Sequence, residues 1–137
     1  MKKIFIDTNI LIDLIADRKP FSKFAIEIFS KAENKQIRLY TSSHSIATTY
    51  YILKKYIDDK ELRQIISGVL EYLHIAPITM DTLKQGLKSK HKDFEDALQI
   101  ISAYSAGNID CIVTRNIKDF RDSEIPVFTP EMAISHF

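Results

Sequence analysis

An aspartate stands near the start of the chain, where a short apolar strand gives way to a helix. The run Ile4-Phe5-Ile6 predicts a buried strand, and the polar run Asp7-Thr8-Asn9 ends it. Apolar residues then recur with helical spacing from Ile10 to Ile15. In open parallel sheets, ligands bind at the carboxyl ends of the strands. Asp7 therefore indicates a functional site at the edge of such a sheet.

Strand and helix patterns alternate along the whole chain. The predicted strands span residues 2–6, 38–41, 74–78, 110–114 and 126–128. The predicted helices span residues 9–17, 21–34, 44–57, 59–73, 80–88 and 93–106, and a last helix begins at Pro130. We expect the second of these helices to bury Phe21 and Phe24. The alternation predicts an α/β three-layer sandwich with a mainly parallel central sheet.

Length and composition indicate one globular domain. The chain has 137 residues and shows no internal repeat or linker, so residues 1–137 are expected to form a single domain. The net charge of +1 means that any contact with nucleic acid must come from a local patch. The lone cysteine, Cys111, excludes an intrachain disulfide. We find neither a signal peptide nor an apolar stretch of the ~18 residues that a membrane span needs, and we expect a cytoplasmic protein.

Two further polar clusters occur where the predicted sheet would bring them near Asp7. The segment Asp93-Phe94-Glu95-Asp96-Ala97 begins a predicted helix, and Thr114-Arg115-Asn116 with Asp119 follows a predicted strand. Two carboxylates about 4 Å apart repel each other by roughly 4 kcal/mol at an effective dielectric near 20, and a cation would remove that cost. The three clusters together predict one metal-binding pocket.

Simpler roles remain open for each of these residues. Asp7 could cap the helix that follows it, and Asp93 could cap its own helix while Asp96 complements the helix dipole. Asn116 and Asp119 could only organise a turn. Glu95 fits best as a solvated surface charge.

The candidate ligands are oxygen donors, without cysteine and without paired histidines. This set favours Mg²⁺ or Mn²⁺ over zinc. Such ions support attack by water on a phosphodiester. The chain also has no glycine-rich phosphate loop, which argues against a nucleotide hydrolase. The site therefore favours phosphodiester hydrolysis.

Three segments, in this order, resemble the motifs of the PIN domain family. They are Phe5-Ile6-Asp7-Thr8-Asn9-Ile10-Leu11, Asp93-Phe94-Glu95-Asp96-Ala97 and Val113-Thr114-Arg115-Asn116-Ile117-Lys118-Asp119-Phe120, and the ending Ile125-Pro126-Val127-Phe128-Thr129-Pro130 also fits. The resemblance covers essentially the whole chain. It implies a Mg²⁺- or Mn²⁺-dependent endoribonuclease that cleaves RNA, often the VapC toxin of a toxin–antitoxin pair. It also implies a homodimer held in check by an antitoxin protein.

The resemblance assigns roles by position. Asp7 matches the first acid of the family, Asp96 the acid before Ala-Leu, and Asn116 or Asp119 the last polar ligand. The predicted metal ligands are thus Asp7, Asp96, Asn116 and Asp119, with Asp93 added to the catalytic set. Predicted substrate contacts are Thr8, Asn9, Ser42, Thr114 and Arg115.

One position departs from the family pattern. PIN domains usually carry an acid in the helix after the second strand, and the nearest equivalent here is Thr48. Either Asp93 replaces that ligand from another element, or the metal is weakly held and activity is low or absent. A catalytically weak or inactive PIN-like module that binds RNA or a protein therefore stays an alternative.

Basic and aromatic residues suggest where RNA could bind. Basic side chains occur at Lys84, Lys88, Lys90, His91 and Lys92, and again at Arg115, Lys118 and Arg121. Beside an acidic pocket they could hold phosphates, although lysine runs are usually just solvated. Tyr50, Tyr51 and Tyr56 could stack on bases, but their helical spacing favours a core or dimer interface.

Overall fold

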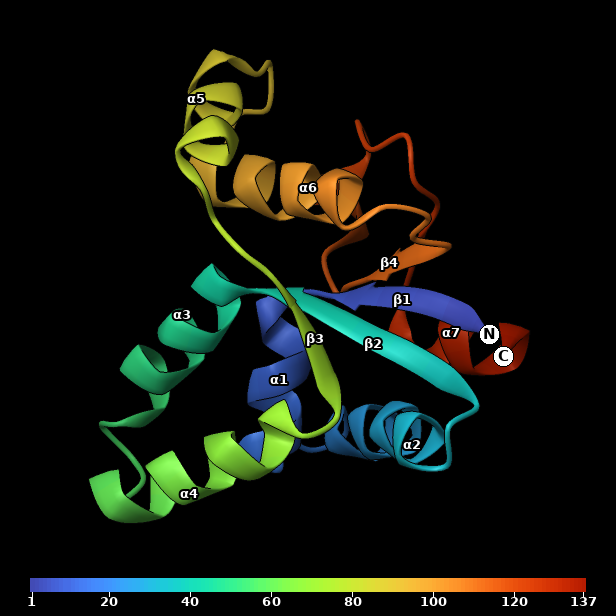
Figure 1. Cartoon of the computed structure of the whole chain (residues 1–137). Helices are drawn as coiled ribbons and strands as arrows, with labels where there is room; N and C mark the ends of the chain where they lie inside the picture. The colour runs from blue at the N-terminus through green and yellow to red at the C-terminus, as the bar shows by residue number, and fades with distance from the viewer.

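The computed structural model describes residues 1–137, and helices and strands alternate along it (Figure 1). The strands are β1 (Lys2–Ile6), β2 (Ile37–Ser42), β3 (Leu73–Ala76), β4 (Cys111–Val113) and β5 (Val127–Phe128). The helices are α1 (Thr8–Ile15), α2 (Ser22–Glu33), α3 (Ser43–Leu53), α4 (Asp59–Leu70), α5 (Met80–Lys88), α6 (Phe94–Ala106) and α7 (Pro130–His136), with a short 3₁₀ helix η1 (Ile117–Phe120). The predicted α/β class is confirmed.

The five strands form one sheet in the order β3-β2-β1-β4-β5, and every neighbouring pair is parallel. The chain first builds outward from β1 through β2 to β3, and it then returns to add β4 and β5 on the other side of β1. The direction of winding therefore changes between β1 and β4. Ligands bind at such a switch point in parallel sheets, outside the carboxyl ends of the strands.

Side chains of β1 alternate between two buried faces of the sheet. Ile4 and Ile6 pack into a core with residues of α1, α2 and α7, whereas Phe5 packs against α6 on the other face. Figure 1 shows α6 on one side of the sheet and α1, α2 and α7 on the other, so helices cover both faces. This layering explains why the strands are short apolar runs.

Some predicted core positions are wrong. Phe21, expected to be buried, precedes α2 and is 38% exposed, while Phe24 is only half-buried. Tyr51 and Tyr56 are 65% and 80% exposed, so they do not belong to the core of this chain. Helical spacing identifies the apolar face of a helix but not how far the neighbouring elements cover it.

Helix α6 is buried around most of its circumference. Ile100 and Ala103 face the sheet, and Leu98 contacts α5 at Gly86. Gly107 ends the helix with a φ of 78°, as its position after the predicted helix suggested. No helix in the structure combines the length and the apolar character needed to cross a bilayer.

Candidate active site

Parallel pairing places the ends of β1, β2 and β4 side by side. Asp7 follows β1, Ser42 ends β2, and Thr114 follows β4. The backbone N–H of Asp7 donates to the carbonyl of Val113 at 2.9 Å, which ties the end of β1 to that of β4. Helix α6 crosses above this edge and contributes Asp96 and Gln99. The candidate site thus draws on segments far apart in the sequence.

Asp7 is nearly buried, with 9% of its surface exposed, and its carboxylate accepts several hydrogen bonds. The Thr8 backbone N–H donates to Oδ1 at 2.8 Å, and the Thr114 hydroxyl donates to Oδ2 at 2.8 Å. Burial raises the pKa of Asp7, and these hydrogen bonds oppose the rise. Asp7 therefore does cap α1, but it also faces a cavity, so the capping role and a site role coexist.

Gln99 holds Asp7 from the middle of α6. Its side-chain amide donates to Asp7 Oδ1 at 3.2 Å and to Ser45 Oγ at 2.6 Å, and its carbonyl accepts from the Ser42 hydroxyl. Ser42 and Gln99 are both buried. Ser42 therefore exposes no surface through which it could contact substrate as predicted. The sequence analysis did not identify Gln99, although a glutamine among the apolar residues of a helix was a visible signal.

Asp96 lies on the first turn of α6, partly exposed. The Asp93 carboxylate accepts from the Asp96 backbone N–H at 3.1 Å, so Asp93 caps the helix, which is one of the two roles expected for it. Loss of hydration, together with the charges of Asp93, Asp7, Asp119 and Glu95, raises the pKa of Asp96 to about 7. The predicted acids therefore do act on one another through space.

Two adjoining cavities contain these side chains. The first, here called the Asp7 cavity, has a volume of about 230 Å³ and is lined by Asp7, Thr8, Asn9, Ile12, His44, Thr48, Ile52, Glu95, Asp96, Gln99 and Asn116. The second, called the Lys118 cavity, has a volume of about 100 Å³ and is lined by His91, Lys92, Asp93, Asp96, Lys118, Asp119, Arg121 and Asp122. Asn116 thus lies with Asp7, whereas Asp119 lies in the neighbouring cavity, and only Asp96 borders both.

The turn that carries Asn116 and Asp119 is well anchored. The Asn116 backbone N–H donates to the Thr114 hydroxyl at 3.0 Å, and the Asp119 N–H donates to the Asn116 carbonyl at 3.0 Å. Phe120, at the end of η1, is buried at 1% exposure and fixes the turn to the core. These hydrogen bonds come from the backbone and the Asn116 side chain does not cap η1, so the side chains of Asn116 and Asp119 are left to line the two cavities.

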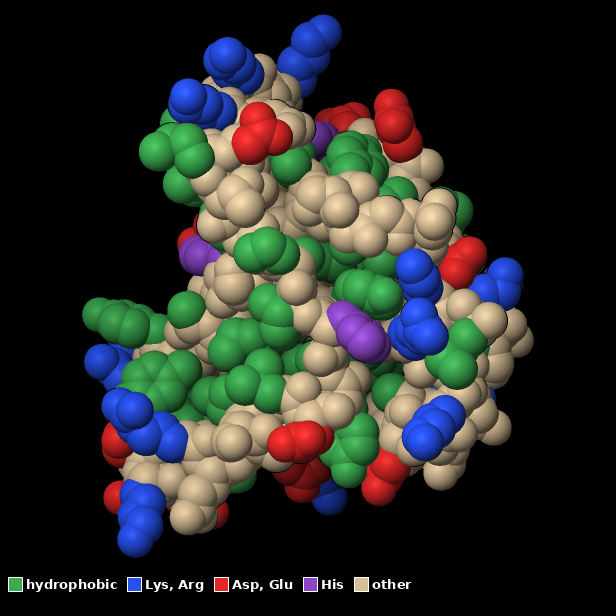
Figure 2. All heavy atoms as spheres, viewed as in Figure 1, with side chains coloured by type: hydrophobic (Ala, Val, Ile, Leu, Met, Phe, Trp, Pro, Cys, Tyr) green, Lys and Arg blue, Asp and Glu red, His purple; other side chains and the backbone are tan.

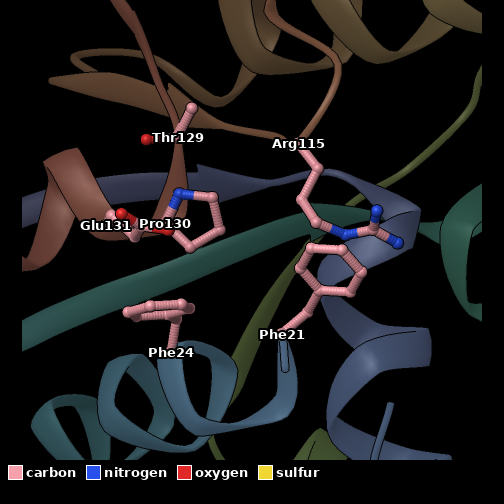
Figure 3. A pocket seen from close by; sticks show the side chains of 6 residues that line it. All are labelled: Phe21, Phe24, Arg115, Thr129, Pro130 and Glu131. Carbon is pink, nitrogen blue, oxygen red and sulfur yellow. The ribbon is translucent and has the colours of Figure 1, made fainter. Parts of the chain in front are cut away.

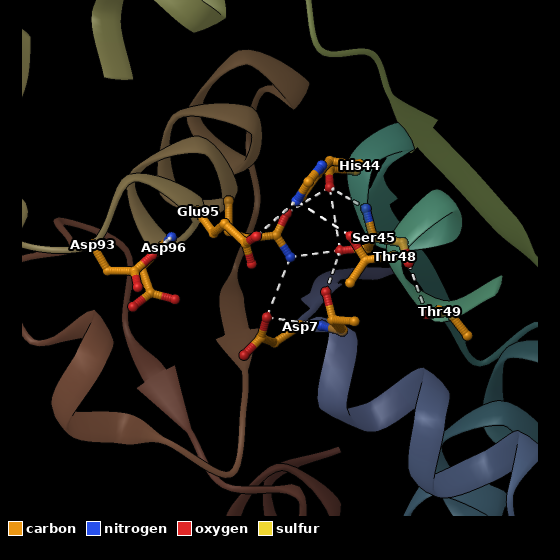
Figure 4. Close-up of polar contacts among 11 residues, drawn as sticks. Asp7, His44, Ser45, Thr48, Thr49, Asp93, Glu95 and Asp96 are labelled. Atoms are coloured by element: carbon orange, nitrogen blue, oxygen red, sulfur yellow. Dashed lines mark hydrogen bonds and ion pairs between the residues drawn. The ribbon is translucent and has the colours of Figure 1, made fainter. Parts of the chain in front are cut away.

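Thr48, the nearest equivalent of the missing acid, lies on α3. Its hydroxyl lies 3.3 Å from His44 Nε2, and the same nitrogen lies 3.8 Å from a carboxylate oxygen of Glu95 (Figure 4). Glu95 is exposed, as expected, yet it points across the Asp7 cavity toward α3 rather than away from it. Asp93 instead lies on the far side of Asp96, at the Lys118 cavity.

Arg115 is held away from the Asp7 cavity. Its guanidinium donates to both oxygens of Asp13, at 2.6 and 3.1 Å, and lies 4.0 Å from the centre of the Phe21 ring. Figure 3 shows this stacking beside a separate pocket of about 330 Å³ that Phe24 and Pro130 also line. Asp13 is 1% exposed and was missed by the sequence analysis, although an acid on a largely apolar helix was its signal.

The remaining predicted substrate contacts lie at the Asp7 cavity. Thr8 and Asn9 line it, and Asn9 Nδ2 also donates to the Thr114 hydroxyl at 3.3 Å. Thr114 is fully buried and is engaged with Asp7 and Asn116. Thr8 and Asn9 can therefore reach a ligand directly, whereas Thr114 acts by holding Asp7.

The donor set suits a hard divalent cation. Asp7, Asp96 and Asn116 present only oxygen and amide groups to one cavity. The pKa values of Asp7 and Asp96 are raised, so their ionised forms are disfavoured, and a bound cation would stabilise them. No three His, Cys, Asp or Glu side chains stand close enough together to coordinate one ion as they are placed. The residues fit a divalent ion in chemistry, and coordination would need the carboxylates to draw closer.

These features define a class: an α/β protein with an acidic site at the carboxyl edge of a parallel sheet. The chain matches the PIN domain over residues 3–118. It is also 30% identical over 136 residues to ribonuclease VapC1 of Aquifex aeolicus, and this alignment covers 95% of the chain and 92% of that protein. The chain belongs to the PIN domain family.

Solved structures share the fold. A toxin–antitoxin complex from Klebsiella pneumoniae is 27% identical with a TM-score of 0.67, covering 93% of this chain and 97% of that one. A DNA-bound VapBC from Salmonella typhimurium is 20% identical with a TM-score of 0.70, covering 95% of this chain and 99% of that one. The second similarity concerns the fold alone.

Proposed function

We propose that the protein is a Mg²⁺- or Mn²⁺-dependent endoribonuclease and the toxin of a toxin–antitoxin pair. The observation that carries the proposal is the pair Asp7, which follows β1, and Asp96 of α6, at one cavity on the carboxyl edge of the sheet. Family membership and the similarity to ribonuclease VapC1 support the same reading.

The residues divide into ligands and positioning groups. Asp7 and Asp96, with Asn116 and Asp119, would hold a divalent ion, which in phosphodiester hydrolysis neutralises the phosphate and activates the attacking water. Gln99 and Thr114 each donate a hydrogen bond to one carboxylate oxygen of Asp7 and so hold the carboxylate in its orientation. Asp96, whose pKa is about 7, can carry a proton at neutral pH until a cation displaces it. Thr8 and Asn9 are placed to contact the substrate.

An antitoxin protein and a second copy of the chain are the proposed partners, and RNA in the cytoplasm is the proposed substrate. An apolar groove of about 450 Å³ runs between α3 and α4, where Ile46, Tyr50, Tyr51, Ile66 and Leu70 line it. Figure 2 shows hydrophobic side chains gathered over this part of the molecule. Exposed apolar surface of this kind commonly marks protein contacts.

RNA cleavage tests the proposed activity. The full chain is incubated with single-stranded RNA and Mg²⁺ or Mn²⁺, with and without chelator, in parallel with Asp7→Asn. We expect cleavage that requires the ion and that falls by at least about 100-fold in the variant. Equal rates for the two proteins would exclude the mechanism.

Thr48 favours one second candidate, a module that binds RNA or protein with little turnover. A threonine in place of the helix acid removes one negative ligand from the α3 side of the cavity. Tight RNA binding without metal and without cleavage would support this candidate, and binding that disappears with chelator would count against it.

A further inference from the structure

The Lys118 cavity differs from the Asp7 cavity in its chemistry. None of its eight lining residues is hydrophobic, and all are charged or titratable. The Asp7 cavity instead includes the apolar Ile12 and Ile52 and several neutral polar side chains beside its acids, and it contains no lysine or arginine. Asp96 stands on the boundary between the two. A substrate that binds beside Asp96 in the Asp7 cavity and extends past Asp96 would enter the Lys118 cavity.

The three cations of the Lys118 cavity are not paired with its carboxylates. Lys92, Lys118 and Arg121 share the cavity with four aspartates, yet none forms an ion pair within 4.0 Å. All three are exposed. By contrast, Arg115 on the same loop is fully engaged by Asp13. The cations of the cavity therefore remain available for an anion from solution.

We propose that the Lys118 cavity is a subsite for an RNA backbone phosphate adjacent to the one cleaved, held by Lys92, Lys118 and Arg121. The ligand follows from the proposed ribonuclease function, because RNA carries a phosphate at each nucleotide. At about 100 Å³, the cavity suits a phosphate group better than a base, and it offers no aromatic ring of Phe, Tyr or Trp for stacking. Contacts of this kind position the strand without reading its sequence.

The three cations come from two segments, the residues around η1 and the bend before α6. Lys118 and Arg121 flank Phe120, whose buried ring anchors η1 to the core. Lys92 directly precedes Asp93, the residue that caps α6. A phosphate bound here would therefore be held at a fixed offset from Asp96, and it would set the register of the RNA over the Asp7 cavity.

Binding of a fluorescein-labelled single-stranded RNA, followed by anisotropy, tests the subsite. The measurement uses the full chain carrying Asp7→Asn with Mg²⁺, so that turnover does not consume the probe. The test triple is Lys92→Ala, Lys118→Ala and Arg121→Ala. Its matched control is Lys2→Ala, Lys55→Ala and Lys60→Ala, which removes the same charge from exposed positions on β1, after α3 and on α4, outside the cavity.

We expect the cavity triple to weaken binding about tenfold. It should also reduce the slope of log affinity against log salt by about 0.7, because one RNA phosphate is no longer neutralised by the protein. The control triple should change binding less than about twofold. A charge-conserving set, Lys92→Arg, Lys118→Arg and Arg121→Lys, should retain binding. Far-UV circular dichroism and the urea midpoint of each variant verify folding.

Equal decreases in affinity in the two triples, or an unchanged affinity in the cavity triple, would overturn the subsite. The binding assay needs no turnover, so its result is separate from the cleavage assay. Wild-type protein that binds RNA through the cavity but never cleaves it would contradict the ribonuclease proposal and support the subsite.

Discussion

The Nε2 of Gln99 lies 3.2 Å from Oδ1 of Asp7, although 92 positions separate the two residues in the chain. Gln99 is 2% exposed and also contacts Ser42 and Ser45, so one amide links β1, β2, α3 and α6. The carboxylate at the centre of the candidate site is thus held by the core of the protein as well as by the neighbouring Thr8 N–H.

Replacing Gln99 should damage both stability and the site. Gln99→Leu removes one hydrogen-bond partner from the buried hydroxyl groups of Ser42 and Ser45 and from Asp7 Oδ1, which costs about 2–3 kcal/mol of unfolding free energy. We expect a lower urea midpoint and reduced RNA cleavage. Gln85→Ala, a change at an exposed glutamine of α5, serves as the control and should leave both unchanged. A Gln99→Leu protein as stable as wild type would refute the supporting role.

The ion pair of Asp13 with Arg115 should stabilise the start of the β4–η1 loop. Arg115→Ala leaves a carboxylate buried at 1% exposure without its partner, and such changes cost about 3–5 kcal/mol. Urea unfolding measures the change. The matched control is Arg63→Ala, because Arg63 pairs with Asp59 on the exposed surface and should show no measurable effect. Similar midpoints for the two variants would contradict this account.

Ser102 carries the one buried side-chain polar atom without a hydrogen-bond partner. Removing it in Ser102→Ala should stabilise the protein by up to about 1 kcal/mol, since an unpaired buried hydroxyl is costly. Ser45→Ala is the comparison, because the Ser45 hydroxyl contacts Thr8, Ser42 and Gln99. We expect that variant to lose about 1–3 kcal/mol. A higher thermal midpoint than wild type for Ser102→Ala and a lower one for Ser45→Ala would agree with the two environments. A destabilised Ser102→Ala would contradict them.

Asp96 should make stability depend on pH in the absence of divalent ions. Its pKa is about 7 in the folded protein and near 3.8 for an unperturbed aspartate, so the folded state binds more protons between these values. Stability is therefore lost as pH rises from about 4 to about 7. Asp96→Asn removes this loss and should be more stable than wild type at pH 8 by about 1 kcal/mol, because solvent screens a partly exposed charge.

Urea titrations at pH 5 and pH 8 measure this difference, with Asp122→Asn as the control at a neighbouring exposed carboxylate. Added Mg²⁺ at pH 8 should stabilise wild type more than Asp96→Asn, since the ion offsets the repulsion around Asp96. An Asp96→Asn protein less stable than wild type at pH 8 without metal would show that the repulsion is not significant.

Local patterns in the sequence were enough to predict the order of the elements and the edge of the sheet where the site lies. Asp7 and Asp96 could be predicted as candidate ligands, because Asp7 directly follows a strand and Asp96 lies in a cluster of acids at the start of a helix. Gln99 and the Asp13–Arg115 pair could not, because their partners come from distant segments that only the packed structure brings together. The expected burial of Phe21 failed for a related reason, since the guanidinium of Arg115, rather than the core, covers its ring.

Titration of Mn²⁺ into the metal-free protein, followed by calorimetry, tests most directly whether Asp7 and Asp96 form one metal centre. Wild type and the exposed control Asp81→Asn should bind Mn²⁺ alike, whereas Asp7→Asn and Asp96→Asn should each bind at least about 10–100-fold more weakly. Equal affinity in all four proteins, or no binding by wild type, would contradict the metal centre and with it the proposed mechanism of RNA cleavage.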